Sequence, residues 1–230
     1  MKYNPRKIFH NDWYDVLLPF TRTSAFEVIL DKINDDLASG VTVFPPKIDV
    51  FRAFNECSFV NTKVVWLGLD PYKNSGEANG LSMATSGEHI PPSLENLMRE
   101  YKTDIEGELD PELITYAHRG VLFLNTALTV RKGETGSHLE LWEPFTRFVF
   151  YQLDKKIGLT FLLLGKEAQK FAKYLGKHHT IIKAVHPVAE SYNPGAGFFG
   201  SRIFSQVNLA CNKYGHESIF KRESVCTDDA

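Results

Sequence analysis

Four short apolar runs, separated by segments with helical spacing, constrain the fold of this 230-residue chain more than any other feature. The runs cover residues 64–67, 121–124, 160–164 and 180–185, and each has the length of a buried strand. Helices are expected between them, among others over 144–155 and 167–175, and the connections are long enough for crossovers. The pattern predicts an α/β fold with a short four-stranded parallel sheet flanked by helices on both faces.

Length and composition favour a single domain. We expect this domain to cover residues 1–222 and to be followed by a loose polar tail over residues 223–230. An apolar content of 43% can support a sizeable core. Residues 24–38 have the spacing of an amphipathic helix, with Ser24 as the expected N-cap and an apolar stripe that ends at Leu37. A second helical pattern follows Pro92.

The chain shows neither a membrane span nor a secretory signal. No run of about 18 apolar residues occurs, and residues 1–9 lack an apolar h-region. The three cysteines are too few and too scattered for a disulfide framework, and they form no pair with zinc-site spacing. We therefore expect an intracellular protein, cytoplasmic or nuclear, and a viral origin is compatible with the same features.

Residues able to carry chemistry follow each of the four expected strands. The first strand leads into Gly68-Leu69-Asp70-Pro71-Tyr72 and the second into Asn125; the third leads into Gly165-Lys166 and the fourth into His186-Pro187. The carboxyl ends of parallel strands meet at one edge of a sheet, where open α/β sheets bind their ligands. An acid, an amide, a glycine turn and an imidazole are thus expected in one crevice, which we interpret as an active site.

These side chains suit the cleavage of an N-glycosidic bond without a metal or cofactor. Asp70 can face an oxocarbenium-like sugar or orient a water, and His186 can donate a hydrogen bond to an oxygen that gains negative charge as a base departs. Asn125 offers an acceptor and two donors, which match the carbonyl and N–H edge of uracil and mismatch cytosine. No metal is expected, because His178 and His179 are adjacent and not spaced by four residues.

Charge is unevenly distributed along the chain. The net charge is −2, but residues 1–110 hold 11 Lys/Arg against 17 Asp/Glu, whereas residues 166–222 hold 9 against 3. The basic stretch can guide phosphate binding. The helical spacing of Lys166, Lys170, Lys173 and Lys177 is equally compatible with an ordinary solvated helix surface.

From about residue 64 to residue 208 the chain resembles the family-1 uracil-DNA glycosylases. That family carries Gly-Gln-Asp-Pro-Tyr-His where residues 68–73 read Gly-Leu-Asp-Pro-Tyr-Lys. Its Pro-Pro-Ser-Leu-Glu-Asn recurs at 91–96, and its Leu-Leu-Asn and Leu-Thr-Val are matched at 123–125 and 128–130. His-Pro-Ser-Pro-Leu-Ser is similar to His-Pro-Val-Ala-Glu-Ser at 186–191, and Gly-Phe-Phe-Gly recurs at 197–200. Motifs in this number and order are not expected by chance.

The resemblance implies a monofunctional hydrolase of base excision repair. Such an enzyme flips deoxyuridine out of single- or double-stranded DNA and hydrolyses the N-glycosidic bond, which releases uracil and leaves an abasic site. Asp70 would stabilise the sugar cation and position water, and His186 would stabilise the uracil anion at O2. Uracil contacts are implied for Leu69, Tyr72, Met83 and Asn125, with Tyr72 blocking the 5-methyl group of thymine. DNA contacts are implied for Lys73, Ser93, Lys166, Glu190, Ser191 and Tyr192.

Four residues depart from the family pattern. Leu69 replaces a glutamine and Lys73 a histidine, and Met83 stands where a phenylalanine stacks on uracil. Glu190 stands where a leucine wedges into the duplex, and a carboxylate is a poor wedge. Tyr192 is the one large aromatic residue of the 188–197 loop, so we expect it to take the wedge role.

Two alternatives remain open at this point. The altered motifs fit a catalytically weak or inactive glycosylase fold that serves as a DNA-binding or replication-associated subunit, and Met83 fits a glycosylase with altered base preference. The family suggests a monomer that binds uracil-containing DNA. Small proteinaceous glycosylase inhibitors are a further possible partner, although the changed Glu190 loop lies where they would dock.

Overall fold

The computed structural model describes residues 5–222, and its strands form two sheets. The larger sheet contains β2 (Val64–Gly68), β3 (Val121–Asn125), β5 (Thr160–Leu164) and β6 (Thr180–Ala184). Its order is β3-β2-β5-β6 and every pairing is parallel. The predicted four-stranded parallel sheet is confirmed, with strand ends within one residue of those expected from the sequence.

A smaller antiparallel sheet joins β1 (Val43–Phe44) to β4 (Val130–Arg131). The sequence analysis did not predict it, because a two-residue strand is too short to show an alternating pattern. This sheet links the segment after α2 to the segment after β3. β4 leads into the loop before α6, and the Lys132 N–H at the start of that loop donates to the Thr42 carbonyl oxygen beside β1 at 2.9 Å.

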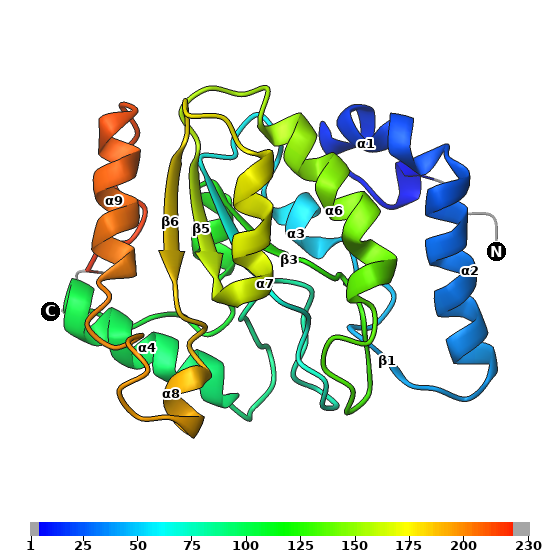
Figure 1. Ribbon diagram of the computed structural model, residues 1–230, viewed down its shortest axis with the longest axis horizontal. Helices are drawn as coiled ribbons and strands as arrows, with labels where there is room; N and C mark the ends of the chain where they lie inside the picture. Colours follow the sequence, from blue (N-terminus) through cyan, green and yellow to red (C-terminus); the bar gives the residue numbers. More distant parts are fainter. Residues whose placement is uncertain (1–4, 223–230) are drawn as a thin grey trace, which may run out of the picture.

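Helices cover both faces of the larger sheet, as expected (Figure 1). One face is covered by α1 (Trp13–Thr21), α2 (Ser24–Ala38), α3 (Arg52–Glu56) and α6 (Leu139–Leu153). The other is covered by α4 (Pro92–Ile105), α5 (Ile114–His118) and α9 (Ile203–Lys213). Shorter elements are η1 (Pro5–Lys7), α7 (Gly165–Gln169), η2 (Lys170–Tyr174) and α8 (Ala189–Tyr192).

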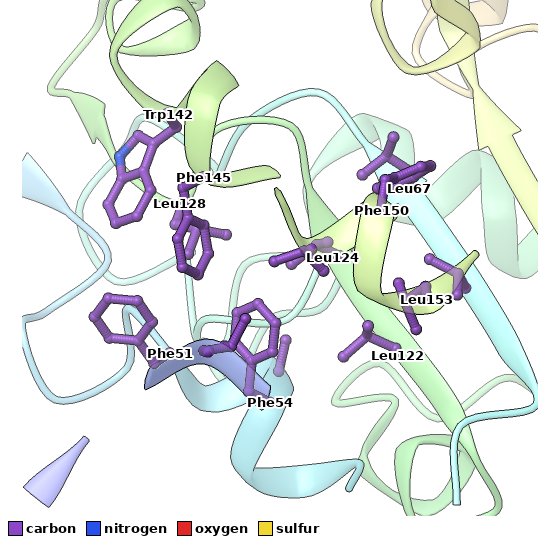
Figure 2. Close-up of a cluster of buried hydrophobic side chains, with 14 of the residues drawn as sticks. Phe51, Phe54, Leu67, Leu122, Leu124, Leu128, Trp142, Phe145, Phe150 and Leu153 are labelled. Atoms are coloured by element: carbon purple, nitrogen blue, oxygen red, sulfur yellow. The ribbon is translucent and has the colours of Figure 1, made fainter. Parts of the chain in front are cut away.

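Alternation along the strands divides the core into two layers. Val65 and Leu67 of β2 point to the layer under α6, whereas Trp66 points to the layer under α9. Figure 2 shows the first layer, in which the rings of Phe54 and Phe145 pack beside the leucine side chains of β3. All five residues of β2, β3 and β5 are buried, as expected for a parallel sheet covered on both sides.

The helix boundaries correct several expectations. α6 begins at Leu139 and not at Pro144, which lies inside the helix. Residues 167–175 are not one helix, because α7 passes into the 3-10 helix η2 at Lys170. The N-cap of α2 is Thr23 and not Ser24, since the Thr23 side chain accepts a hydrogen bond from the Phe26 N–H. Leu37 is 49% exposed, so the apolar stripe of α2 does not extend to it.

None of the helices within residues 5–222 combines the length and apolar character needed to cross a bilayer. The expected tail over residues 223–230 lies outside the described residues. The carboxyl ends of all four parallel strands face the side of the molecule where α8 and one end of α4 lie (Figure 1).

Candidate active site

A cleft of about 660 Å³ opens at the carboxyl edge of the larger sheet. The groups predicted to meet there do so: Asp70 follows β2, Asn125 ends β3, Gly165 follows β5 and His186 follows β6, and all four line the cleft. The cleft is also lined by Leu69, Tyr72, Lys73, Met83, Ser93, Lys166 and Tyr192. Of the predicted site residues, Glu190 and Ser191 do not line it.

The Asp70 carboxylate is held from one side. Its Oδ2 accepts a hydrogen bond of 2.6 Å from the backbone N–H of Gly136, in the loop between β4 and α6. Burial raises the pKa of Asp70, while the Gly136 hydrogen bond and the nearby Lys73 charge oppose that rise. Asp70 is thus a partly desolvated carboxylate with one oxygen fixed, which suits it to stabilise a developing positive charge.

His186 is arranged as a neutral hydrogen-bond donor. Its Nδ1 faces the backbone N–H of Val188 at 3.3 Å, so the proton of the neutral ring is assigned to Nε2. Burial lowers the pKa of His186 to about 4, so the ring is neutral near pH 7. The imidazole approaches the strand end closely: a Cβ on Gly165, whose φ is +83°, would lie 3.1 Å from the His186 Cβ. Glycine at 165 therefore permits this contact.

Asn125 presents its amide at the bottom of the cleft. The residue is 7% exposed, and its Oδ1 is buried without a hydrogen-bond partner in the free protein. It is paired with Gly68 in the β2–β3 register, and a Cβ on Gly68 would lie 2.6 Å from that Oδ1 and 2.3 Å from Ser82 Oγ. Glycine at 68 is therefore needed for the amide to occupy this position. An unpartnered buried carbonyl oxygen in a native protein calls for an explanation, and a hydrogen bond from a bound ligand would supply one.

The side wall of the cleft is built by Tyr72, Met83 and Ser93. The Tyr72 hydroxyl donates to the Met83 carbonyl oxygen at 2.9 Å and accepts from Ser93 Oγ at 3.1 Å, which fixes the phenol ring. Burial raises the pKa of Tyr72 well above its ordinary value. Met83 has φ of +66°, which is unusual for a residue with a side chain and typical of functional sites. Ser93 is 4% exposed, so its hydroxyl serves the wall in the free protein.

The two lysines predicted to meet DNA lie at the cleft, and the rest of the expected basic face is divided. Lys73 is half-buried beside Asp70, and Lys166 is exposed on α7. Lys170 pairs with Glu167 at 2.6 Å, and the change from α7 to η2 breaks the helical alignment of the four lysines. The cleft thus carries two cations but no continuous basic helix face.

The loop after His186 corrects the expectation for Glu190. Its side chain is buried, with 6% of the residue exposed, and its carboxylate accepts hydrogen bonds from the backbone N–H groups of 195, 197 and 198 at 2.7–2.9 Å. Glu190 therefore holds the loop together, and its carboxylate is buried within the loop and not presented at the surface. Ser191 is exposed and bonds to Asn96, while Tyr192 is 84% exposed at the rim of the cleft.

Two contributors to the site were missed from the sequence. Gly136 supplies the backbone N–H that holds Asp70, and Thr126 bonds the carbonyl oxygen of Leu69 through its hydroxyl. The contribution of Gly136 is made by the backbone and has no residue-type signature. Thr126 directly follows Asn125, so its position at the end of a predicted strand was the available signal.

Asp154, His178 and His179 form the one group of three possible metal ligands in the part of the chain that the structure describes. Their ligand atoms lie within 4.8 Å of one another, so adjacency does not separate the two histidines as expected. However, the Leu159 N–H donates to His179 Nδ1, which assigns the proton of the neutral ring to Nε2, 3.4 Å from Asp154. A metal would need a lone pair at that nitrogen. The cluster is therefore arranged as a polar contact and not as a ligand set.

Comparisons with known proteins find similarity to uracil-DNA glycosylases at the level of family, sequence and structure. Residues 54–210 match the uracil DNA glycosylase superfamily. A uracil-DNA glycosylase of Neisseria gonorrhoeae is 41% identical over 214 residues, which are 90% of this chain and 97% of that protein. One from Bacillus cytotoxicus is 37% identical over 220 residues, 93% of this chain and 96% of that protein. Among solved structures, a mimivirus uracil-DNA glycosylase superposes with a TM-score of 0.85 at 24% identity, covering 96% and 90% of the two chains. A mimivirus UNG variant in complex with UGI gives 0.86 at 23% identity, covering 96% and 92%.

Proposed function

Because this chain belongs to the uracil DNA glycosylase superfamily and is a uracil-DNA glycosylase of DNA repair, we propose that Asp70, Asn125 and His186 carry its reaction. The observation that carries this assignment is that the three groups line one cleft, each in the state that its role in the reaction requires. They are a carboxylate held by one oxygen, an unpartnered amide oxygen and a neutral imidazole with its proton on Nε2.

The proposed chemistry follows the charges that develop. The C1′–N1 bond breaks heterolytically, which leaves positive charge on the sugar and negative charge on the uracil. Asp70 stabilises the sugar cation, and His186 donates a hydrogen bond from Nε2 to O2 of the departing base. Water then adds to C1′ and gives up a proton by way of Asp70 to solvent, and solvent returns a proton to N1 of the uracil anion, so the products are uracil and an abasic site. A single donor to a developing anion is worth about 10²–10³ in rate.

Base selection is proposed to depend on Asn125 and Tyr72. The free Oδ1 of Asn125 accepts the N3–H of uracil, and its amide N–H donates to O4. Cytosine reverses that pattern, and such a mismatch costs about 1–3 kcal/mol. The Tyr72 ring, held through two hydrogen bonds, excludes the methyl group of thymine. Met83 covers the face of the base, and the backbone near Leu69 adds polar contacts.

The flipped nucleotide is proposed to be held by residues at the rim of the cleft. Lys73 and Lys166 attract phosphates as point charges, Ser93 supplies a hydroxyl group from the cleft wall, and Ser191 supplies one from the exposed loop beside the cleft. Tyr192 acts as the wedge in the duplex, because it is a large ring, 84% exposed, on a loop that the buried Glu190 carboxylate organises. A rigid loop loses less conformational freedom when its ring enters the base stack.

We also propose that proteinaceous glycosylase inhibitors bind this protein at the same rim. The support is the fold shared with the mimivirus UNG variant in complex with UGI, together with the ordered loop that presents Tyr192. Titration of uracil release with UGI tests this proposal. Inhibition that weakens in Tyr192→Ala is the expected result, and undiminished activity at saturating UGI contradicts it.

Uracil release from single-stranded and duplex oligonucleotides in EDTA, with Asp70→Asn as control, tests the proposed function. Release by the wild type alone is expected. Equal release by Asp70→Asn contradicts the role of Asp70, and a loss of release in EDTA that added metal restores contradicts the metal-free chemistry. Loss of duplex activity in Tyr192→Ala, with single-strand activity retained, is expected for the wedge. An unchanged ratio of the two activities contradicts it.

A further inference from the structure

A loop far from Asp70 in sequence crosses over the segment that carries it. This loop, residues 132–138, joins β4 to α6 and makes two backbone contacts with the segment. The Gly133 N–H donates to the Lys73 carbonyl oxygen at 3.1 Å, and the Gly136 N–H donates to Asp70 Oδ2 at 2.6 Å. The position of Gly136 therefore decides whether Asp70 keeps its hydrogen bond. Gly136 has φ of +81°, a conformation that glycine adopts without strain.

A buried carboxylate on α2 holds both ends of this loop. Asp36 is 4% exposed, and its two oxygens accept hydrogen bonds of 2.8 Å from Nε and Nη2 of Arg131, which precedes the loop. Its Oδ2 also lies 2.9 Å from Nε2 of His138, which ends the loop. We call Asp36, Arg131 and His138 the Asp36 clamp. The hydrogen-bonded Arg131 guanidinium holds the pKa of Asp36 far below its usual range, so the carboxylate stays ionised.

A directed chain of hydrogen bonds fixes the His138 ring. Nε2 faces a carboxylate, which only accepts, so this nitrogen carries the proton of the neutral ring. Nδ1 then accepts from the Thr129 hydroxyl at 2.8 Å, and that hydroxyl accepts from Trp142 Nε1 at 2.7 Å. Burial lowers the pKa of His138, although the Asp36 carboxylate opposes this effect. Each polar group of the chain has a partner, which fits a structural element with one geometry.

We infer that the Asp36 clamp is a positioning device for the reaction: it fixes the 132–138 loop so that the Gly136 N–H holds Oδ2 of Asp70 and leaves the other oxygen for the sugar and water. The inference rests on the proposed function of Asp70. Asp36 and His138 touch no reacting atom and act through the loop, so they are positioning residues. Their loss removes a donor that stabilises ionised Asp70, which raises its pKa and weakens its placement.

The test compares Asp36→Asn and His138→Gln with a matched control, His179→Gln. His179 is also a buried histidine beside an aspartate, but it lies at the opposite edge of the sheet. Single-turnover uracil release is measured against pH, and the Gly136 amide proton is followed by NMR. The clamp variants are expected to release uracil about three- to tenfold more slowly, the range for one lost hydrogen bond. The acid limb of their pH–rate profile is expected to move to higher pH by about half to one unit.

Every charged group around Asp70 is left in place in this comparison, whereas His138→Gln changes one of the groups that face Asp36. Asp70 shares the cleft with Lys73, Glu77, His89, Lys166, Glu167 and His186, and Asp36 is faced by Lys32, Arg131 and His138, with Glu134 beside Arg131. The His179→Gln control is expected to lower the melting temperature without moving the acid limb or the Gly136 resonance. If Asp36→Asn does not fold, Arg131→Lys, which removes the two-pronged contact at a partly exposed position, is measured in the same way.

The outcomes separate the inference from the function on which it rests. The clamp is supported if the acid limb of the pH–rate profile and the Gly136 amide resonance both move in the clamp variants and neither moves in His179→Gln. The clamp inference is overturned if its variants lose thermal stability while the acid limb of the pH–rate profile and the Gly136 amide resonance stay unchanged. That outcome leaves the role of Asp70 intact. If Asp70→Asn releases uracil at the wild-type rate, the proposed function itself fails.

Discussion

Replacement of Gly68 by alanine tests how closely the base-reading amide is fitted to the sheet. A Cβ at this position would lie 2.6 Å from Asn125 Oδ1 and 2.3 Å from Ser82 Oγ, whereas ordinary contacts begin near 3.4 Å. The Ser82 hydroxyl can rotate about its single χ1 bond. The Asn125 amide must instead retreat by about 0.8 Å, the difference between 3.4 and 2.6 Å.

Magnitudes for catalysis and stability follow from this geometry. A misplacement near 1 Å costs about 10²-fold in rate, so kcat/KM for uracil release from single-stranded DNA is expected to fall about 100-fold. Overpacking of a core costs about 1–3 kcal/mol, which for a chain of this size lowers the melting temperature by roughly 2–12 °C. The loss of activity should thus far exceed the loss of folded protein at 25 °C.

Two variants serve as controls for Gly68→Ala. The double variant Gly68→Ala/Ser82→Gly removes the contact with Ser82 but keeps the contact with Asn125, so it should recover at most part of the stability and none of the activity. Gly107→Ala adds a methyl group at a position remote from the cleft, where the nearest atom lies at 3.3 Å, and should change little. Uracil release within twofold of wild type in folded Gly68→Ala would refute the reasoning that the Asn125 amide reads the base from this position.

Further predictions concern selectivity, the loop and pH. Asn125→Asp should lose uracil selectivity and gain turnover on cytosine, measured on matched oligonucleotides, because an ionised carboxylate accepts where the amide donates. Tyr192→Ala should lower duplex activity about tenfold relative to single-strand activity, and Glu190→Gln should do so more weakly, because the carboxylate that organises the loop is lost. Turnover of the wild type should fall as pH drops through the pKa of Asp70, which burial raises above its ordinary value. His186, with a pKa of about 4, should remain a neutral hydrogen-bond donor at pH values above this fall in turnover.

The strands and the residues at their ends could be predicted because their signals are local. β2, β3 and β5 are continuous buried runs and β6 is a mainly apolar one, and Asp70, Asn125 and His186 end these strands or follow them within two residues. The parallel topology then brings them to one edge, whatever the details of the helices. The wall residue Tyr72 was found for the same reason, since it lies two residues after Asp70 in the first strand-end segment.

Polar contacts between distant segments could not be predicted in this way. Asp36 looks like a solvated helix residue, and its burial depends on Arg131 and His138, which lie 95 and 102 residues further along the chain. Glu190 was expected to contact DNA because it stands where the resembled family has its wedge residue. Its partners are backbone N–H groups five to nine residues away, and the residue types at those positions do not indicate such contacts. The same holds for the Gly136 N–H that meets Asp70.

The most direct test of the central claim compares turnover with binding in Asp70→Asn. Single-turnover uracil release and the affinity for an uncleavable uracil-containing oligonucleotide are measured in EDTA near pH 7, together with the melting temperature. The account predicts a loss of turnover of at least about 10²-fold, nearly unchanged DNA affinity, and a melting temperature equal to or above that of the wild type, because burial disfavours the charge that is removed. Turnover and affinity that fall by the same factor, or turnover that does not fall, would contradict it.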